Sequence, residues 1–202
     1  MPVQLVLASS SPRRRQLLER LGVAPARVAC PDIDETPLKA EQPRAYALRL
    51  ALAKAEAIAR MQDEIVLAGD TTVALGRCIL PPADTEQVQR DLLRKLSGRR
   101  HHVLSAICVI DGKGRARTRL ADTTVAFKPL SPDEIDAYIA TGEGLGKAGG
   151  YAVQGYAEAF VRFLAGSHSG VIGLPLFETR ALLKWAGLPL LQQGGRPGAS
   201  LA

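Results

Sequence analysis

The stretch Gln4-Leu5-Val6-Leu7-Ala8-Ser9-Ser10-Ser11-Pro12-Arg13-Arg14 decides the fold class of this chain. Its first five residues are mostly apolar and predict a buried strand. Ser11 can cap a helix whose first position is Pro12, where a missing backbone N–H costs nothing. Leucines at helical spacing continue this helix, and Gly22 ends it. The chain therefore opens with a strand, a tight turn and a helix.

The rest of the chain alternates helices and strands. We predict helices over residues 44–61, 84–96 and 174–186 with a short one from 131, and strands over 65–68, 101–110, 117–127 and 159–165. The first of these helices has Leu48, Leu52, Ala55 and Ala59 at helical spacing, and an extension of the first of these strands over 73–75 stays open. The turn Asp111-Gly112-Lys113-Gly114 joins the two long strands as a β-hairpin. This pattern predicts an α/β fold in which helices flank a mixed twisted sheet with a central cleft. If the sheet is continuous, the acidic loop over 31–43 and the glycine-rich loop over 142–150 would flank that cleft. We expect a single domain over residues 1–190 and a disordered tail over 191–202.

Composition narrows the class of partner. The 202 residues carry a formal net charge of +6, which favours anionic partners such as nucleotides, nucleic acid or acidic membranes. Only 4% of residues are aromatic, so base stacking has little support and we expect no stable complex with nucleic acid. No apolar stretch is long enough to span a membrane, so no membrane association is expected. A homodimer is an open alternative to a monomer.

Cysteine usage and the N-terminus bear on the compartment. The three cysteines are far apart, odd in number and form no C-x-x-C pair. They predict neither a disulfide framework nor a zinc site, and they favour a reducing compartment. The first residues do not have the order of a signal peptide, because the apolar run precedes the positive charges. These features predict a cytoplasmic protein.

The turn from Ser9 to Arg14 has three features that suit phosphate. A helix N-terminus offers unpaired N–H groups and partial positive charge. Serine hydroxyls add further donors, and the guanidinium groups of Arg13 and Arg14 match phosphate oxygens. The alternative is a well-capped helix whose arginines lie in solvent.

Two acidic positions suggest metal or acid–base chemistry. Asp70 follows a predicted buried strand, and ligands of open α/β sheets bind at such strand ends. A carboxylate there can bind Mg²⁺ and orient or deprotonate water. The acidic loop Asp34-Glu35 offers a second carboxylate. The alternatives are a turn aspartate that caps Thr72 and a solvated acidic loop.

Two other patterns are interpreted as coincidental. The stretch from Gly144 to Gly149 fits G-x-G-x-x-G, but a helix precedes it and a strand follows it, so no βαβ unit surrounds it. His101 and His102 are adjacent on a predicted strand and point to opposite faces. They are therefore poorly placed to share a metal.

The ordered set of motifs resembles the Maf family of nucleoside triphosphate pyrophosphatases, from about residue 4 to residue 188. Each motif alone is weak evidence for the family, but the occurrence of all of them in this order is specific to it. They are residues 7–14, Asp34-Glu35, 49–55, 69–71, 96–99, 147–149, 151–155 and 171–176.

The resemblance implies hydrolysis between the α and β phosphates, which yields a nucleoside monophosphate and pyrophosphate. It also implies a divalent metal cation, Mg²⁺ or Mn²⁺, held by Glu35 and Asp70. Asp70 would accept a proton from the attacking water. Phosphate contacts would come from Ser9, Arg13, Arg14 and Lys54.

Substrate choice also follows from the resemblance. The branch that prefers dTTP and UTP combines the equivalents of Arg13, Thr71 and Gln154, all present here. The Gln154 amide has both a donor and an acceptor for the O4/N3–H edge of uracil or thymine. The alternatives are another base, such as 7-methyl-GTP or a modified uridine triphosphate, or a non-enzymatic basic protein that binds nucleic acid or regulates septum formation.

One segment departs from the family pattern. The family commonly has Ile-Leu-Gly-Lys-Pro after the central strand, and its lysine contacts phosphates. This chain has Ile79-Leu80-Pro81-Pro82, so the loop is one residue shorter and the lysine is absent. Arg77 is one candidate replacement. Otherwise the turn from Ser9 to Arg14, which we call the basic turn, is expected with Lys54 to neutralise a larger share of the negative charge of the phosphates than is usual in the family.

Overall fold

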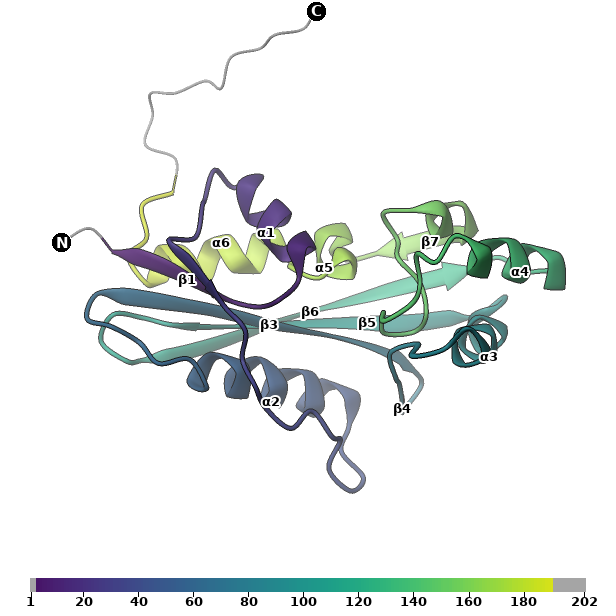
Figure 1. The fold of residues 1–202 in the computed structure, drawn as a ribbon, viewed down its shortest axis with the longest axis horizontal. Helices are drawn as coiled ribbons and strands as arrows, with labels where there is room; N and C mark the ends of the chain where they lie inside the picture. The colour runs from purple at the N-terminus through teal and green to yellow at the C-terminus, as the bar shows by residue number, and fades with distance from the viewer. Residues whose placement is uncertain (1–2, 191–202) are drawn as a thin grey trace, which may run out of the picture.

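Seven strands form one mixed, twisted sheet in the computed structural model of this chain, which describes residues 3–190 (Figure 1). The strands are β1 (Gln4–Ala8), β2 (Arg27–Ala29), β3 (Glu64–Leu75), β4 (Cys78–Leu80), β5 (Arg100–Ile110), β6 (Ala116–Phe127) and β7 (Val161–Ala165). Their order is β2-β1-β3-β5-β6-β7, with β4 paired to β3. β1 runs parallel to β2 and β3, and the other pairs are antiparallel. The predicted α/β class with a mixed sheet is confirmed, whereas the predicted tail lies outside the described residues.

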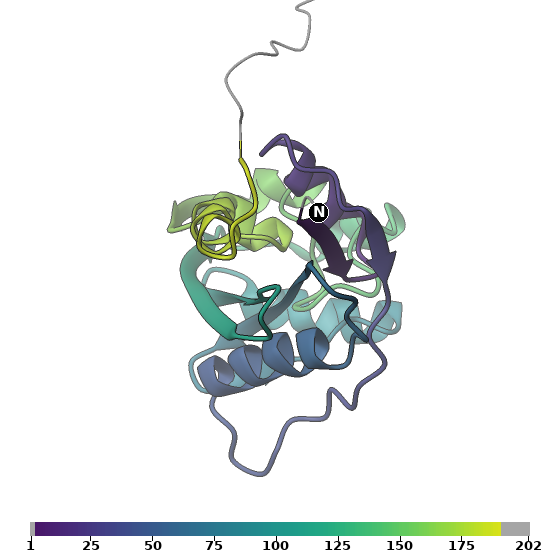
Figure 2. The same ribbon diagram turned by 90° about the vertical axis from the view of Figure 1, so that its left-hand side faces the viewer.

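Helices cover both faces of this sheet. They are α1 (Pro12–Glu19), α2 (Pro43–Glu56), α3 (Glu86–Leu96), α4 (Pro132–Ala140), α5 (His168–Ile172) and α6 (Leu176–Trp185), with a 3₁₀ turn, η1, over Tyr156–Phe160. α2 lies on one face, and α1, α5 and α6 lie on the other (Figures 1 and 2). The core is divided accordingly into two clusters of buried side chains. None of the helices within residues 3–190 is long and apolar enough to cross a membrane.

α2 packs on the sheet through small side chains. Ala47, Ala51 and Ala55 are fully buried at a spacing of four residues and belong to the same cluster as Val66 and Ala68 of β3. Small residues on both elements let the helix backbone approach the sheet closely. The same side of α2 carries Lys54, which is therefore also buried.

The predicted boundaries and apolar face of this helix were partly wrong. α2 ends at Glu56 rather than near Met61. The predicted face included Leu48 and Leu52, but these side chains are only partly buried, at the edge of the alanine face. Alanine has high helix propensity whatever its surroundings, so propensity alone did not show which side of the helix meets the sheet.

β3 differs most from its prediction. The sequence predicts a short strand over 65–68 that ends at residues 69–72, with an extension over 73–75 left open. β3 instead runs without a break to Leu75 and places Asp70 mid-strand. β5 pairs with β3 from Val66 to Ala74. On its other side, β3 pairs with β1 up to Ala68 and with β4 from Val73. Within the described residues, positions 69–72 thus have a strand partner on one side only, and we call them the open edge of β3.

Other local predictions hold. β5 and β6 form the predicted hairpin, with Ile110 opposite Ala116. Ser131 forms a complete capping box with Glu134 at the start of α4. The elements that sequence reasoning missed, β2, β4, α5 and η1, have three to five residues each. Segments this short show no readable hydrophobic periodicity.

Candidate active site

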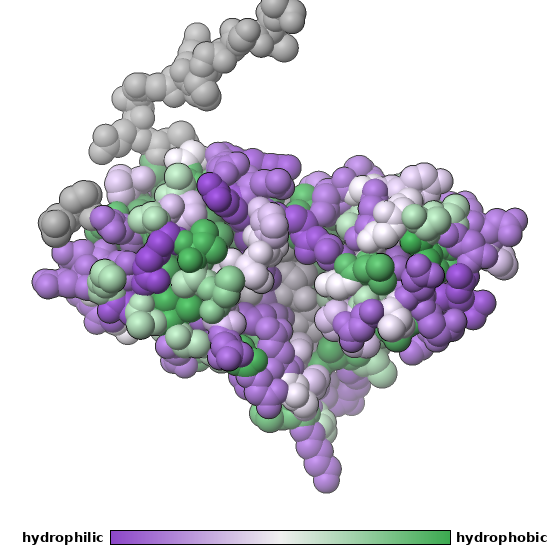
Figure 3. Space-filling model, viewed as in Figure 1, coloured by the Kyte–Doolittle hydropathy of each residue, from purple (hydrophilic) through white to green (hydrophobic). Residues whose placement is uncertain are grey.

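The open edge of β3 lies between two cavities. The basic cavity, about 210 Å³, is lined by Ser11, Arg13, Arg14, Val73, Val103, Gly146, Lys147, Tyr151, Ala152, Gln154, Val171, Ile172 and Gly173. The acidic-loop cavity, about 430 Å³, is lined by Glu35, Thr36, Pro37, Tyr46, Thr72, Ile79, Leu80 and Pro81. Asp70, Thr71, Pro82 and Ala148 line both. The two cavities therefore adjoin at the open edge, where the surface is hollowed (Figure 3), and the predicted cleft between the acidic and glycine-rich loops is confirmed.

Successive residues of β3 serve the two sides of this cleft. Side chains alternate between the faces of a strand. The Asp70 carboxylate contacts Lys54 of α2 on one face. The Thr71 hydroxyl contacts Arg14 of α1 on the other face. One strand thus contributes adjacent polar groups to both sides of the sheet.

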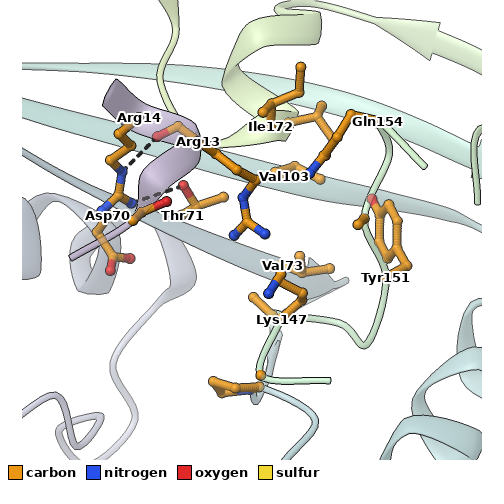
Figure 4. A pocket seen from close by; sticks show the side chains of 17 residues that line it. Arg13, Arg14, Asp70, Thr71, Val73, Val103, Lys147, Tyr151, Gln154 and Ile172 are labelled. Carbon is orange, nitrogen blue, oxygen red and sulfur yellow. Dashed lines mark hydrogen bonds between the residues drawn. The ribbon is translucent and has the colours of Figure 1, made fainter. Parts of the chain in front are cut away.

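Arg14 is held by protein groups. Its Nε donates to the Gly173 carbonyl at 2.9 Å, and one terminal nitrogen donates to Thr71 Oγ1 at 3.4 Å (Figure 4). The other terminal nitrogen donates to Ser9 Oγ at 3.0 Å. Burial lowers the pKa of the Arg14 guanidinium. These bonds link α1, β3 and the end of α5, so Arg14 fixes the wall of the cleft.

The serines of the turn differ from their prediction. Ser11 occupies the N-cap position of α1 with extended backbone, but its hydroxyl makes no capping hydrogen bond. Ser9 is buried instead, and its Oγ accepts from the Ser11 N–H at 3.2 Å as well as from Arg14. The Ser11 side chain lines the basic cavity. The basic turn is therefore organised around Ser9 and Arg14.

Arg13 is directed into the basic cavity. It makes no hydrogen bond or ion pair with any residue between 3 and 190, and burial lowers the pKa of its guanidinium. Lys147 lies on the facing wall (Figure 4). Burial, and then the positive charge of Arg13, lower the pKa of the Lys147 ammonium. Sequence reasoning missed Lys147 as a site residue, although the Lys147-Ala148-Gly149 motif was a usable signal.

The glycine-rich loop forms turns rather than a dinucleotide-binding motif, as interpreted. Gly149 has φ of 71°, and a Cβ there would lie 2.9 Å from Val73 Cγ1. Only glycine combines this backbone conformation with so close an approach to β3. The loop is therefore seated directly on the strand that carries Asp70.

Lys54 joins the two predicted acidic residues. Its Nζ lies 2.9 Å from Asp70 Oδ1 and 2.9 Å from Glu35 Oε1. The Thr72 hydroxyl donates to Asp70 Oδ2 at 2.8 Å. Both Asp70 oxygens are thus bonded, and the residue is buried, with 6% of its surface exposed. The alternative of a turn aspartate is right about the contact with Thr72 and wrong about the turn, because the Asp70–Thr72 pair lies within β3.

Asp34 and Glu35 have different environments. Asp34 Oδ1 accepts from the Thr36 N–H at 2.8 Å, and hydrogen bonds from Thr36 lower the pKa of Asp34. Asp34 lines neither cavity, whereas Glu35 lines the acidic-loop cavity. Of the acidic loop, only Glu35 is brought to Asp70.

The pair Glu35 and Asp70 suits a cation shared with a substrate. Within residues 3–190, no three side chains of His, Cys, Asp or Glu are grouped as metal ligands. Mg²⁺ is commonly bound by one or two carboxylates, with substrate phosphates and waters completing its shell. Glu35 and Asp70, which both contact the Lys54 ammonium, match this kind of shared cation site. They are too few to form a metal site in which protein side chains supply every ligand.

The far end of the basic cavity is suited to a flat, polar-edged group. Gln154 and Tyr151 lie there with the apolar side chains of Val103 and Ile172 (Figure 4). The Gln154 amide is exposed and makes no hydrogen bond within the described part of the chain. Its donor and acceptor are both available for a ligand.

A buried histidine supports this end. His101 Nε2 and Tyr151 Oη lie 2.8 Å apart, and burial lowers the pKa of His101 to about 4. His102, by contrast, is exposed and pairs with Asp122. The two histidines point to opposite faces as predicted, so they do not form a metal site.

Arg77 does not replace the lysine that the family pattern would place near Pro81. Its Nε donates to Gln42 Oε1 at 3.2 Å on an exposed turn, and it lines neither cavity. Pro82 forms a β-bridge with Ala148 across the cleft. The segment from Pro81 to Pro82 therefore contributes an uncharged wall.

The fold and cleft define a class, the α/β proteins with a cleft lined by basic side chains beside a carboxylate–lysine centre. The chain belongs to the Maf family, because the family model described as Maf-like protein matches residues 4–186. It is 67% identical over 187 residues to the dTTP/UTP pyrophosphatase of Sphingopyxis alaskensis, which covers 92% of this chain and 98% of the relative. It is 59% identical to the dTTP/UTP pyrophosphatase of Novosphingobium aromaticivorans, with 92% of each chain covered.

Among solved structures, a nucleoside-triphosphatase (dITP/XTP pyrophosphatase) of Mycobacterium abscessus aligns with a TM-score of 0.41 and 17% identity. The alignment covers 69% of this chain and 94% of that chain.

Proposed function

We propose that this chain is a dTTP/UTP pyrophosphatase, which hydrolyses the bond between the α and β phosphates to give a nucleoside monophosphate and pyrophosphate. The observation that carries the proposal is the position of Asp70 on the open edge of β3. There it borders both the basic cavity and the cavity of the acidic loop. The activity named for relatives up to 67% identical over nearly the whole chain supports the same assignment.

The base is assigned to the far end of the basic cavity. Gln154 supplies the amide for the O4/N3–H edge, and Tyr151 with its apolar neighbours supplies the walls. The phosphates then extend past Arg13 toward Asp70. Arg13 is the residue of the basic turn whose guanidinium is unpaired in the described structure, so it is the one we assign to direct phosphate contact. Ser9, Arg14 and Thr71 shape the turn that receives the phosphates.

Asp70 is assigned as the proton acceptor. Water attacks the α-phosphorus, the P–O bond to the β-phosphate breaks, and the proton of the water passes to the Asp70 carboxylate. Lys54 and Thr72 fix the orientation of that carboxylate before substrate arrives. Such positioning, with stabilisation of charge, is the main catalytic contribution in phosphoryl transfer.

Glu35 and Asp70 are assigned to hold a divalent cation, Mg²⁺ or Mn²⁺. When bound, the cation supplies positive charge against the phosphate oxygens and orients the leaving group. Lys54 lies between the two carboxylates and keeps them close together. It also supplies a cation of the protein itself at this end of the cleft.

The test is a panel of nucleoside triphosphates, including dTTP, UTP, 7-methyl-GTP and modified uridine triphosphates, incubated with Mg²⁺ or Mn²⁺. Both pyrophosphate and monophosphate are measured. We expect release of pyrophosphate from dTTP and UTP, and no release by Asp70→Asn. Absence of release from every triphosphate across a metal series would overturn the proposal.

We also propose a cytoplasmic location and a single domain over residues 1–190. Cys30 and Cys78 are exposed and free, which suits a reducing compartment. Fractionation tests the location, and a single cooperative unfolding transition tests the domain. Light scattering distinguishes a homodimer from a monomer.

A further inference from the structure

The basic cavity contains two positive charges that no acid of the described structure neutralises. Arg13 and Lys147 reach into it from opposite walls (Figure 4). Asp70 is the one acid among the residues that line this cavity within the described range, and its two oxygens are bonded to Lys54 and Thr72. Two like charges in a partly desolvated space are unfavourable unless an anion joins them. The cavity thus has the charge of a site for an anion.

The Lys147 side chain has little to do within the protein. The hydrogen bond that its Nζ makes inside residues 3–190 goes to the backbone carbonyl of Leu145, at 3.3 Å and two residues away. A bond this local and exposed does not hold two elements together. The ammonium is therefore available to a ligand.

The backbone that carries Lys147 is firmly placed. The Lys147 carbonyl accepts from the Ala83 N–H at 3.1 Å, and the Ala83 carbonyl accepts from the Gly146 N–H at 2.9 Å. The Gly149 N–H donates to the Pro81 carbonyl at 3.2 Å. The glycine-rich loop is thus paired with the segment from Pro81 to Ala83. A binding group on such a backbone is preorganised, so less ordering entropy is lost when it meets a ligand.

Lys147 occupies a middle position in the cavity. Figure 4 shows it with Arg13 between Asp70 at one end and Gln154 at the other. In the substrate placement given above, the base lies at Gln154 and the reacting α-phosphorus lies near Asp70. The group that passes between Arg13 and Lys147 is therefore the α-phosphate with its ribose.

We propose that Lys147 is a substrate-binding residue that contacts the α-phosphate from the wall opposite Arg13. The assignment rests on the proposed function for the placement of the base. It gives the glycine-rich loop a direct role in the reaction. The Lys147 ammonium also supplies a positive charge beside Pro81 and Pro82, the two uncharged residues that follow β4.

The test compares Lys147→Met with Lys147→Arg and with Lys113→Met, a matched loss of an exposed lysine in the β5–β6 hairpin. Calorimetry measures the dissociation constants of dTMP and of inorganic pyrophosphate, and steady-state kinetics measure kcat/KM for dTTP. A charge-assisted hydrogen bond corresponds to about a tenfold to hundredfold change in affinity. We expect Lys147→Met to raise the dissociation constant of dTMP by that factor and to lower kcat/KM for dTTP by the same factor. Lys147→Arg should recover most of it, and Lys113→Met should match the wild type.

Each other outcome is decisive. If Lys147→Met binds dTMP and turns over dTTP like the wild type, Lys147 does not contact substrate. If Lys147→Met binds pyrophosphate more weakly but binds dTMP as the wild type does, the assignment of Lys147 to the α-phosphate is wrong. An unchanged melting temperature separates lost contact from lost folding. Turnover by the wild-type protein judges the proposed function separately, because dTMP binding needs no catalysis.

Discussion

Lys54 Nζ lies 2.9 Å from Asp70 Oδ1, and both side chains are buried. Removing one member of a buried ion pair leaves an uncompensated charge, at a cost of about 3 kcal/mol. We expect Lys54→Met to lower the free energy of unfolding by about this amount and to abolish pyrophosphate release. Adding Asp70→Asn to Lys54→Met should restore much of the stability and none of the activity. Urea unfolding of the two single variants and the double variant measures this coupling, and additive losses would contradict it.

The hydroxyl of Thr72 positions the second oxygen of Asp70. Thr72→Val keeps the shape of the side chain and removes the donor of the 2.8 Å bond. A hydrogen bond to a charged group contributes about 1.5–3 kcal/mol. We expect kcat for dTTP to fall at least about tenfold with little change in KM. Thr72→Ser, which keeps the hydroxyl, is the control. A KM effect without a kcat effect would place Thr72 in substrate binding instead.

Gln154 is predicted to select the base. Gln154→Leu removes the amide at similar size and leaves the apolar wall intact. A pocket that hydrogen-bonds its substrate discriminates strongly through those bonds. We expect the ratio of kcat/KM between dTTP and a purine triphosphate to fall at least about tenfold. Equal ratios in variant and wild type would show that the base binds elsewhere.

Arg14 is predicted to be more important for stability than for direct contact with substrate. Arg14→Lys keeps the charge but cannot reach Gly173, Ser9 and Thr71 together, because lysine lacks the planar fork. We expect the free energy of unfolding to fall by about 1–3 kcal/mol. Arg13→Lys, at a side chain without such bonds, should leave stability close to that of the wild type while raising KM for dTTP. Urea unfolding and steady-state kinetics measure the two effects. Equal loss of stability in both variants would contradict this division.

His101 predicts a pH range in which the fold weakens. Its folded pKa of about 4 lies below the ordinary value of 6.5, so the unfolded chain takes up the proton first as pH falls. The contribution of His101 to stability is therefore complete above about pH 6.5 and is lost as pH falls toward 4. We expect His101→Gln to flatten this part of the stability curve, measured by urea unfolding at pH 7, 5.5 and 4. His102→Gln, at an exposed position, should follow the wild type.

Local signals predicted much of the framework. The opening strand, turn and helix, the hairpin over 111–114 and the Ser131 cap depend on residues close in sequence. All three form, although the Ser11 hydroxyl does not make the predicted capping hydrogen bond. Gly69-Asp70-Thr71-Thr72 was different, because its composition favours a turn. Pairing with β5 from Val66 to Ala74 overrides that preference and keeps the chain extended. For residues 69–72 this pairing involves partners from Ile107 to Leu104, which are distant in the sequence.

The candidate site was predictable by residue type and less so by arrangement. The sequence and its resemblance identified Asp70, Glu35 and Lys54, but not that one ammonium bridges both carboxylates. Arg13 and Arg14 were both predicted to contact phosphate, whereas the structure directs Arg13 into the cavity and bonds Arg14 to the protein. Lys147 was missed because its position depends on pairing between residues 81–83 and 146–149. These distinctions come from tertiary contacts, which adjacent residues do not encode.

The open edge of β3 has a consequence for inhibitor design. The basic cavity and the acidic-loop cavity share Asp70, Thr71, Pro82 and Ala148, so a short linker along those residues can join two small fragments, one in each cavity. Once the first fragment binds, the second is held at an effective concentration in the millimolar range for a short flexible linker. One compound would then combine an anionic fragment that binds Arg13 and Lys147 with an uncharged fragment that packs against Pro81 and Pro82. The selectivity of this compound would depend on its fit to Pro81 and Pro82, which form the uncharged wall of the acidic-loop cavity.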